Sequence, residues 1–208
     1  MSTNWASWEL SPWEQWAVSS STPSDSNRCW PLPNRWISPS TCTPASPQAP
    51  VSGAYYAGNW PAALHFLFSG PAFGWHAEAG IHVIRLILSG ALDRHPNLKL
   101  LSGHWGELVA GWLDRLDEVF GWAGHTERLP SEYYRNHVWV TPSGMFSHNQ
   151  FRYILAEVGA DRIIHSEDFP YVVRDNVAEF LESADISDEQ RRAIAHRNAE
   201  KLLRIDQT

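Results

Sequence analysis

A histidine and a glutamate lie three residues apart, at the point where an apolar run gives way to a helical pattern. His104 and Glu107 belong to the stretch LKLLSGHWGE, whose apolar residues Leu98, Leu100 and Leu101 are typical of a short buried strand. Imidazole gains and loses a proton near neutral pH, and a carboxylate partner fixes its tautomer. The spacing therefore predicts a proton-transfer site, although a strand-to-helix turn whose histidine only caps the next helix fits it equally well.

Two further strand-like segments also end in polar loops. The segment HVWVT leads into PSGMFS, and RIIH leads into SEDFP. Loops that follow parallel strands share one edge of the sheet, which is where α/β barrels carry their chemistry. His165 could instead pack against the wall of that edge. We expect one crevice to be faced by His104, Ser143, His165, Glu167 and Asp168.

Helical and strand-like patterns alternate along the chain from residue 74 onward. This alternation predicts parallel βαβ units in an α/β protein. A loop over 51–61 and a short apolar segment over 62–68 precede it. A Ser187–Gln190 capping box opens a final helical region, which runs toward Leu203 with a break near 196–198. The expected elements are helix 74–92, strand 98–102, helix 106–121, strand 137–141, helix 147–158, strand 162–165 and helix 174–184.

The composition argues against several classes of partner. A net charge of -7 disfavours nucleic acid and anionic membrane surfaces. The sequence has no long uninterrupted apolar run and no signal-like start, so we expect neither a membrane span nor secretion. Two cysteines, Cys29 and Cys42, are too few for a disulfide scaffold and match no zinc motif. A reduced, cytoplasmic protein is expected.

The first fifty residues differ from the rest of the chain. They hold six of the twelve tryptophans and eight of the fourteen prolines, and neither a histidine nor a lysine. Proline and serine oppose regular backbone hydrogen bonding. We predict an irregular Trp/Ser/Pro-rich segment over 1–50 and a folded domain over 51–208. A proline-rich ligand for an aromatic groove is an alternative role for the first segment.

The polar loops and their order resemble the amidohydrolase-related (amidohydrolase 2) family of metal-dependent decarboxylases. This family includes enzymes that act on dihydroxybenzoates and on amino-carboxymuconate semialdehyde. A GHxGE loop, an SxDxP loop about sixty residues later and a terminal NAxxLL carry the resemblance in combination. The similar segments are GWHAEAGIHVIRLILSGALDRHPNLKLLSGHWGE, VTPSGMFS, GADRIIHSEDFPY and RNAEKLL, between roughly residues 70 and 208.

The resemblance implies a (β/α)8 TIM barrel with one divalent metal ion, which would be zinc, manganese or magnesium. The aspartate of the SxDxP loop, Asp168, would bind the metal. His104 would sit beside the metal and move a proton, and Glu107 would hold or tune that histidine. Trp75 and Tyr171 occupy positions that line a flat substrate in the family. All these roles are expectations that come from the resemblance.

The chain departs from the family at the other metal ligands. The family's metal also takes an H/E-x-H pair from the first strand and a histidine from a middle strand. No histidine precedes His65, which is the only candidate for the third ligand. His76, His82 and His95 are expected on helix faces or at helix caps and not as ligands. We therefore predict an α/β protein with a partial TIM barrel, roughly the C-terminal half, whose metal site is incomplete.

Three readings of function remain open. The first is a metal-dependent carboxy-lyase that decarboxylates a small aromatic or enolic carboxylic acid, incomplete in this chain. The second is a catalytically silent truncated fragment, and the third is a metal-dependent hydrolase of the same superfamily. The expected partner is a small carboxylic acid, with neither nucleic acid nor membrane. Because an open half-barrel exposes an apolar inner face, either a partner chain, as in a homo-oligomer, or the N-terminal segment is expected to cover it.

Overall fold

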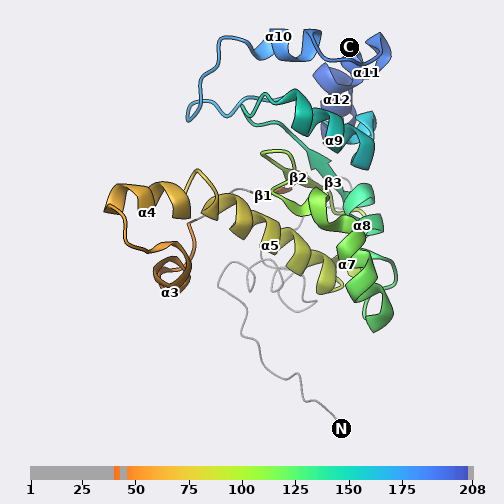
Figure 1. Ribbon diagram of the computed structural model, residues 1–208. Coiled ribbons are helices and arrows are strands. Elements are labelled where there is room, and N and C mark those ends of the chain that lie inside the picture. The colour runs from red at the N-terminus through yellow and green to blue at the C-terminus, as the bar shows by residue number, and fades with distance from the viewer. Residues whose placement is uncertain (1–39, 43–45, 206–208) are drawn as a thin grey trace, which may run out of the picture. The chain divides into compact units, whose positions relative to one another are not determined.

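Three short parallel strands form the sheet that organises the chain (Figure 1). The computed structural model describes residues 40–42 and 46–205. The strands are β1 (Ser40–Cys42), β2 (Leu100–Ser102) and β3 (Val138–Val140), in the order β1-β2-β3. A parallel bridge between Val140 and Ile163 adds a fourth position beyond β3. The parallel sheet predicted from the alternation of elements is confirmed.

Helices connect the strands and complete the described part of the chain. Within that part, no helix combines the length and the apolar character needed to cross a membrane. Five single turns of 3-10 or π-helix extend or join the helices. The α-helices are α3 (Ala49–Val51), α4 (Ala62–Ser69), α5 (Gly74–Leu88), α6 (Ala91–Arg94), α7 (Leu113–Phe120), α8 (Pro130–His137), α9 (His148–Val158), α10 (Val177–Glu182), α11 (Asp188–Arg192) and α12 (Asn198–Leu203).

β1 lies within the segment that the sequence predicts to be irregular. Its residues Ser-Thr-Cys stand between Pro39 and Pro44 and carry no apolar alternation, so no sequence pattern marks them as a strand. The strand exists because its backbone pairs with β2, with Ser40 opposite Leu100 and Cys42 opposite Ser102. The remaining predictions for residues 1–39 and 43–45 concern residues outside those described.

The core forms between the sheet and the helices that cover it. Val138 and Val140 of β3 are fully buried, as a strand with helices on both faces requires. On α5, Val83 and Ile87 enter the core, whereas Ile81 is 48% exposed. Ile84 and Leu86 are partly buried and also pack against the core, so the buried side of α5 is centred on Val83 and Ile87.

Several element boundaries agree with the sequence. α9 buries Phe151, Ile154 and Val158, the face predicted for helix 147–158, and the Ser147 hydroxyl caps it. The Ser187–Gln190 capping box is also present. The helix expected over 74–92 is instead divided into α5 and α6 by Gly90, which adopts a left-handed φ of 68°.

Three other boundaries were wrong. The predicted loop 51–61 begins with α3 and a π-turn, Ser52–Tyr56. The predicted strand 162–165 is reduced to a single bridge at Ile163. It extends no further because the amide of His165 donates to the Ile194 carbonyl and not to β3. Helix 174–184 shortens to α10, which leaves a longer loop after Asp168.

Asn198, in the terminal NAxxLL motif, ties α12 to the last bridge of the sheet. Its buried side-chain amide donates to the carbonyls of Ala160 and Ile163, at 2.7 and 2.8 Å. We expect Asn198→Ala to lower the free energy of unfolding by about 2 kcal/mol, because it leaves two carbonyls without a donor. Urea unfolding measures this change. Asn149→Ala, at an exposed position on α9, is the control and should change stability by less than about 0.5 kcal/mol.

Candidate active site at the carboxyl edge of the sheet

Five consecutive residues after β2 have positive φ. The values are 45° for His104, 61° for Trp105, 84° for Gly106, 51° for Glu107 and 69° for Leu108. Each non-glycine residue in this region costs about 1 kcal/mol or more, so surrounding contacts must hold the turn. The helix predicted to begin at 106 therefore begins only at α7, after a 3-10 turn. Glu107 is turned back toward His104 instead of starting a helix.

Hydrogen bonds to the β3 loop hold this left-handed turn in place. The Trp105 amide donates to the Thr141 carbonyl at 2.9 Å, and the Trp105 indole donates to the Met145 carbonyl at 2.6 Å. Within the turn, the Gly106 amide donates to the Gly103 carbonyl at 2.7 Å. The two bonds of Trp105 join the loop after β2 to the loop after β3. Together with the bond inside the turn, they fix the backbone conformation at Glu107.

Glu107 is completely buried and binds two imidazoles. One carboxylate oxygen lies 2.7 Å from Nδ1 of His104, and the other lies 2.7 Å from Nδ1 of His76. The two imidazole rings are 4.5 Å apart between centroids, and each side chain is 15% exposed. A buried carboxylate needs such partners, because its charge cannot be solvated. The predicted His104–Glu107 contact is therefore present, but it is one half of a three-residue group.

His76 lies on a helix, as expected, but its bond to Glu107 was not predicted. It lies in the first turns of α5, and its Nε2–H donates to the Pro71 carbonyl at 3.0 Å. Gly80, one turn further along, allows the close approach, since a Cβ there would lie 2.3 Å from the Glu107 carbonyl oxygen. The one available signal was spacing: His76 and Gly80 are four residues apart, on one side of a helix.

The hydrogen bond to Glu107 raises the pKa of His76 above its ordinary value of 6.5, against the opposing effect of burial. A raised pKa in the folded state stabilises the fold below the unfolded value, and this contribution is lost as pH rises through the folded value. We therefore expect the stability advantage of the wild type over His76→Asn to be largest below about pH 6.5 and to shrink at higher pH. Urea unfolding at a series of pH values measures it. An advantage that grows with pH would contradict this account.

Asp168 approaches His104 from the third loop of the edge. Its Oδ2 atom lies 3.8 Å from Nε2 of His104. The Ser143 amide donates to the Ser166 hydroxyl at 3.3 Å, which joins the β3 loop to the loop that carries Asp168. The chain thus brings His104, Glu107 and Asp168 together at the carboxyl edge, as the strand order predicts.

The other residues predicted for this crevice do not contact the group around Glu107 directly. His165 stacks on Phe146 at 5.6 Å and its Nε2–H donates to the Val177 carbonyl, so it packs against the wall; burial lowers its pKa. The hydroxyl of Ser143, named for the same crevice, bonds the Thr141 hydroxyl at 2.9 Å. Glu167 is exposed.

The structure also shows the surroundings of Trp75 and Tyr171, the expected substrate contacts, and of His65, the candidate third metal ligand. The Trp75 indole donates to the Ser46 hydroxyl at 3.0 Å, beside His76 on α5. Tyr171 is 87% exposed and does not cover the group around Glu107. His65 bonds the Ser52 hydroxyl through Nε2 at 2.9 Å and does not belong to that group.

His76, His104 and Glu107 form a group that could hold a metal ion. Each offers one ligand atom, and these atoms lie within 4.8 Å of one another. Two imidazole nitrogens and one carboxylate are a donor set typical of catalytic divalent ions. The Nε2–H bond of His76 to Pro71 also fits, because a ligating histidine commonly donates its other nitrogen to a carbonyl. The donor chemistry therefore suits the divalent ion that the resemblance implies.

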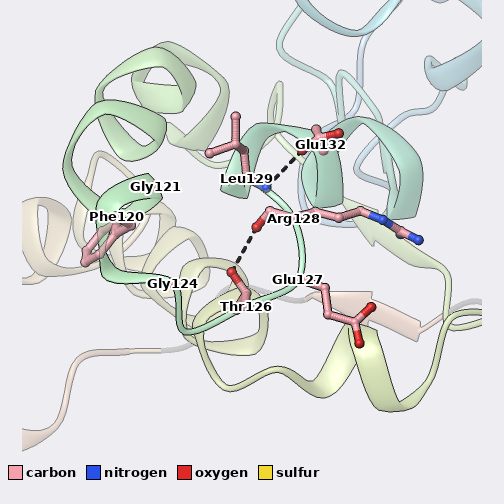
Figure 2. A pocket seen from close by; sticks show the side chains of 8 residues that line it. All are labelled: Phe120, Gly121, Gly124, Thr126, Glu127, Arg128, Leu129 and Glu132. Carbon is pink, nitrogen blue, oxygen red and sulfur yellow. Dashed lines mark hydrogen bonds between the residues drawn. The ribbon is translucent and has the colours of Figure 1, made fainter.

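A hollow of about 170 Å³ lies away from this edge, in the loop between α7 and α8 (Figure 2). Two of its polar side chains bond to the backbone of the loop itself. The Thr126 hydroxyl donates to the Arg128 carbonyl, and Glu132 accepts from the Leu129 amide. Both bonds stabilise the start of α8. We therefore place no chemistry there.

Comparisons with known proteins agree with the sequence resemblance. The amidohydrolase family model matches residues 46–205. The decarboxylase orsB of Emericella nidulans is 31% identical over 72% of this chain and 47% of its own length. The structure of 5-carboxyvanillate decarboxylase LigW from Sphingomonas paucimobilis has a TM-score of 0.71 at 29% identity, covering 80% of this chain and 49% of that one. A dihydroxybenzoic acid decarboxylase from Polaromonas, with bound manganese and 2-nitroresorcinol, has a TM-score of 0.73 at 28% identity, covering 82% and 51%.

The chain spans about half the length of these relatives. The structural similarities imply a TIM-barrel-like α/β fold, and a solved relative binds manganese, in line with the expected divalent ion. The match of the family model covers most of the chain and includes every residue of the group around Glu107. The chain therefore belongs to the amidohydrolase family.

Proposed function

We propose that this chain is roughly the C-terminal half of a (β/α)8 barrel and carries the proton-transfer side of a metal-dependent decarboxylase site. The substrate would be a small aromatic or enolic carboxylic acid. The observation that carries the proposal is the contact of His104 with Glu107 on one ring nitrogen and with Asp168 near the other. Relatives named as decarboxylases of carboxyvanillate and dihydroxybenzoic acid support the reaction class.

The reaction requires one proton to reach the ring carbon as the bond to the carboxylate breaks and CO2 leaves. Nε2 of His104 is the candidate for this transfer, because its Nδ1 is held by Glu107. Glu107 fixes the orientation of the imidazole and cannot rotate away, since its second oxygen is held by His76. General acid–base assistance of this kind contributes about 10²–10⁴-fold to a rate.

A divalent ion at this edge would withdraw negative charge from the substrate carboxylate and a neighbouring oxygen. Asp168 would bind it, together with His76 and Glu107, while His104 would stay unligated beside it. Asp168 is suitably placed, with a side chain 29% exposed and next to Nε2 of His104. In the proposal, these donors hold the ion in this chain by itself, and water fills the positions that the family takes from segments this chain does not span.

The positions of Trp75 and Tyr171 stay proposals for substrate contacts. Trp75 lies in the first turn of α5, and its indole donates to the Ser46 hydroxyl. Tyr171 follows Asp168 by three residues, on a loop whose antiparallel bridge joins Asp168 to Val172. A cytoplasmic location also stays a prediction.

Metal analysis and CO2 release test the proposal. The purified chain should retain manganese, zinc or magnesium and, once loaded, release CO2 from at least one member of a panel of hydroxybenzoates. A silent fragment would retain no metal and release no CO2. A hydrolase of the same superfamily would retain metal and cleave esters or amides instead. Either of these results would replace the decarboxylase assignment.

A further inference from the structure

Ser143 and Gly144 form a tight turn in the loop after β3. Their φ values are 45° and 77°, and the Met145 amide donates to the Pro142 carbonyl at 3.0 Å, which closes the turn. Positive φ at both central positions is the geometry of a type I′ turn. Glycine would adopt the φ of position 143 more readily than serine does, so the backbone geometry alone does not favour the serine.

The Ser143 hydroxyl lies beside the buried carboxylate of the candidate site. A Cβ atom on Gly103 would lie 2.9 Å from Oγ of Ser143 and 3.6 Å from Oε1 of Glu107. This Oε1 atom is the one that bonds Nδ1 of His104. The hydroxyl therefore occupies the space that a side chain at position 103 would need, next to the group that holds His104.

The second residue of the turn faces the loop that carries Asp168. A Cβ atom on Gly144 would lie 3.4 Å from Cβ of Asp168 and 3.4 Å from a methyl carbon of Val172. The turn is thus close to the loop of Glu107 on one side and to the loop of Asp168 on the other. A small acid bound between His104 and Asp168 would lie next to this turn.

The proton of the Ser143 hydroxyl is free to be donated to a bound molecule. Oγ of Ser143 lies 2.9 Å from Oγ1 of Thr141, and within the described residues neither hydroxyl has another hydrogen-bond partner. Thr141 is buried, whereas Ser143 is partly exposed. A buried hydroxyl that does not donate loses a bond that water cannot replace, so Thr141 is the donor of this pair. Because a hydroxyl has one proton, Ser143 accepts from Thr141 and retains its own proton for another acceptor.

The proposed substrate offers such an acceptor. In the proposed function, the divalent ion contacts the carboxylate and one neighbouring oxygen of the acid. An aromatic acid with an oxygen on each side of its carboxylate has a second such oxygen, which would need a donor from the protein. The Ser143 hydroxyl is a neutral donor that lies between the loops of His104 and Asp168.

We propose that Ser143 determines specificity, because its hydroxyl donates a hydrogen bond to the second oxygen that flanks the leaving carboxylate. This inference rests on the proposed function for the class of ligand. It goes beyond that function by favouring acids with an oxygen on both sides of the carboxylate over acids with an oxygen on one side.

Two unreactive ligands test the contact through binding and not through turnover. 2-Nitroresorcinol has a nitro group in place of the carboxylate and a hydroxyl on each side of it, whereas 2-nitrophenol has one hydroxyl. We expect Ser143→Ala to weaken binding of 2-nitroresorcinol to the manganese-loaded chain about three- to tenfold, and that of 2-nitrophenol less than about twofold. Isothermal titration calorimetry measures both dissociation constants.

Two further variants separate the lost hydroxyl from a change of fold. Ser143→Gly also removes the hydroxyl but suits the positive φ, so it should weaken binding of 2-nitroresorcinol as much as Ser143→Ala does. Ser89→Ala removes a hydroxyl that donates to the Leu86 carbonyl at the C-terminal end of α5, away from His76. This control should leave both dissociation constants unchanged.

The outcomes distinguish this inference from the proposed reaction. Equal losses for the two ligands, or no loss in either variant at position 143, would overturn the inference even in a chain that decarboxylates hydroxybenzoates. A selective loss for 2-nitroresorcinol in a chain that releases no CO2 would support the inference and overturn the proposed reaction. A wild type that binds neither ligand would contradict both.

Discussion

Replacement of Glu107 by leucine is expected to lower the free energy of unfolding by about 3 kcal/mol, one of the two largest effects in this chain. Removal of one partner from a buried ionic group leaves the others uncompensated. Here both His76 and His104 lose their acceptor at once. The left-handed turn also loses a contact that offsets the energetic cost of its positive φ values. Urea unfolding at neutral pH measures the change.

A double-mutant cycle separates the interaction from the volume change. Because an apolar replacement of both partners can restore much of the loss, Glu107→Leu combined with His76→Leu should be more stable than the sum of the single changes predicts. Glu118→Leu is the matched control. Glu118 pairs with Arg115 on the surface, and such exposed pairs contribute little. Equal costs at positions 107 and 118 would contradict the account of the buried group.

His104→Asn and Asp168→Asn are each expected to reduce decarboxylation at least about a hundredfold, with helical content unchanged. Asparagine at 104 places an amide near the position of Nδ1, so it retains a donor for Glu107 and removes Nε2. Asparagine at 168 retains the shape of the side chain and removes its charge. CO2 release by the metal-loaded chain measures activity, and far-UV circular dichroism measures helical content.

The control for these two variants is His165, a histidine that lies three residues before Asp168 in the sequence. His165→Gln keeps a donor near Nε2 for the Val177 carbonyl and should leave activity within about a factor of three. If His104→Asn and Asp168→Asn both lose secondary structure, the two residues are structural and the site proposal fails. If His165→Gln abolishes activity as they do, His165 belongs to the site.

The sequence predicted the parts of the fold that rest on local patterns. α9, the Ser187–Gln190 capping box and the end of β2 before His104 all follow from apolar periodicity, capping and glycine. The meeting of His104 with Asp168 followed from strand order alone, because carboxyl ends of parallel strands share an edge.

The features that it missed depend on contacts between distant segments. β1 has no apolar pattern and exists through pairing with β2. The turn over 104–108 looked helical in sequence, yet hydrogen bonds to Thr141 and Met145 hold it left-handed. His76 was missed because its partner is thirty-one residues away, across a helix–loop contact that only Gly80 allows.

We propose that His104, held by the buried Glu107 and adjoining Asp168, transfers the proton in a metal-dependent decarboxylation. The most direct measurement is CO2 release from 2,6-dihydroxybenzoate and related hydroxybenzoates by the manganese-loaded chain, with His104→Asn in parallel. We predict metal-dependent CO2 release that the variant loses while it retains bound manganese. Release that is equal in the wild type and in His104→Asn would contradict the claim, as would a loaded, folded wild type that releases none.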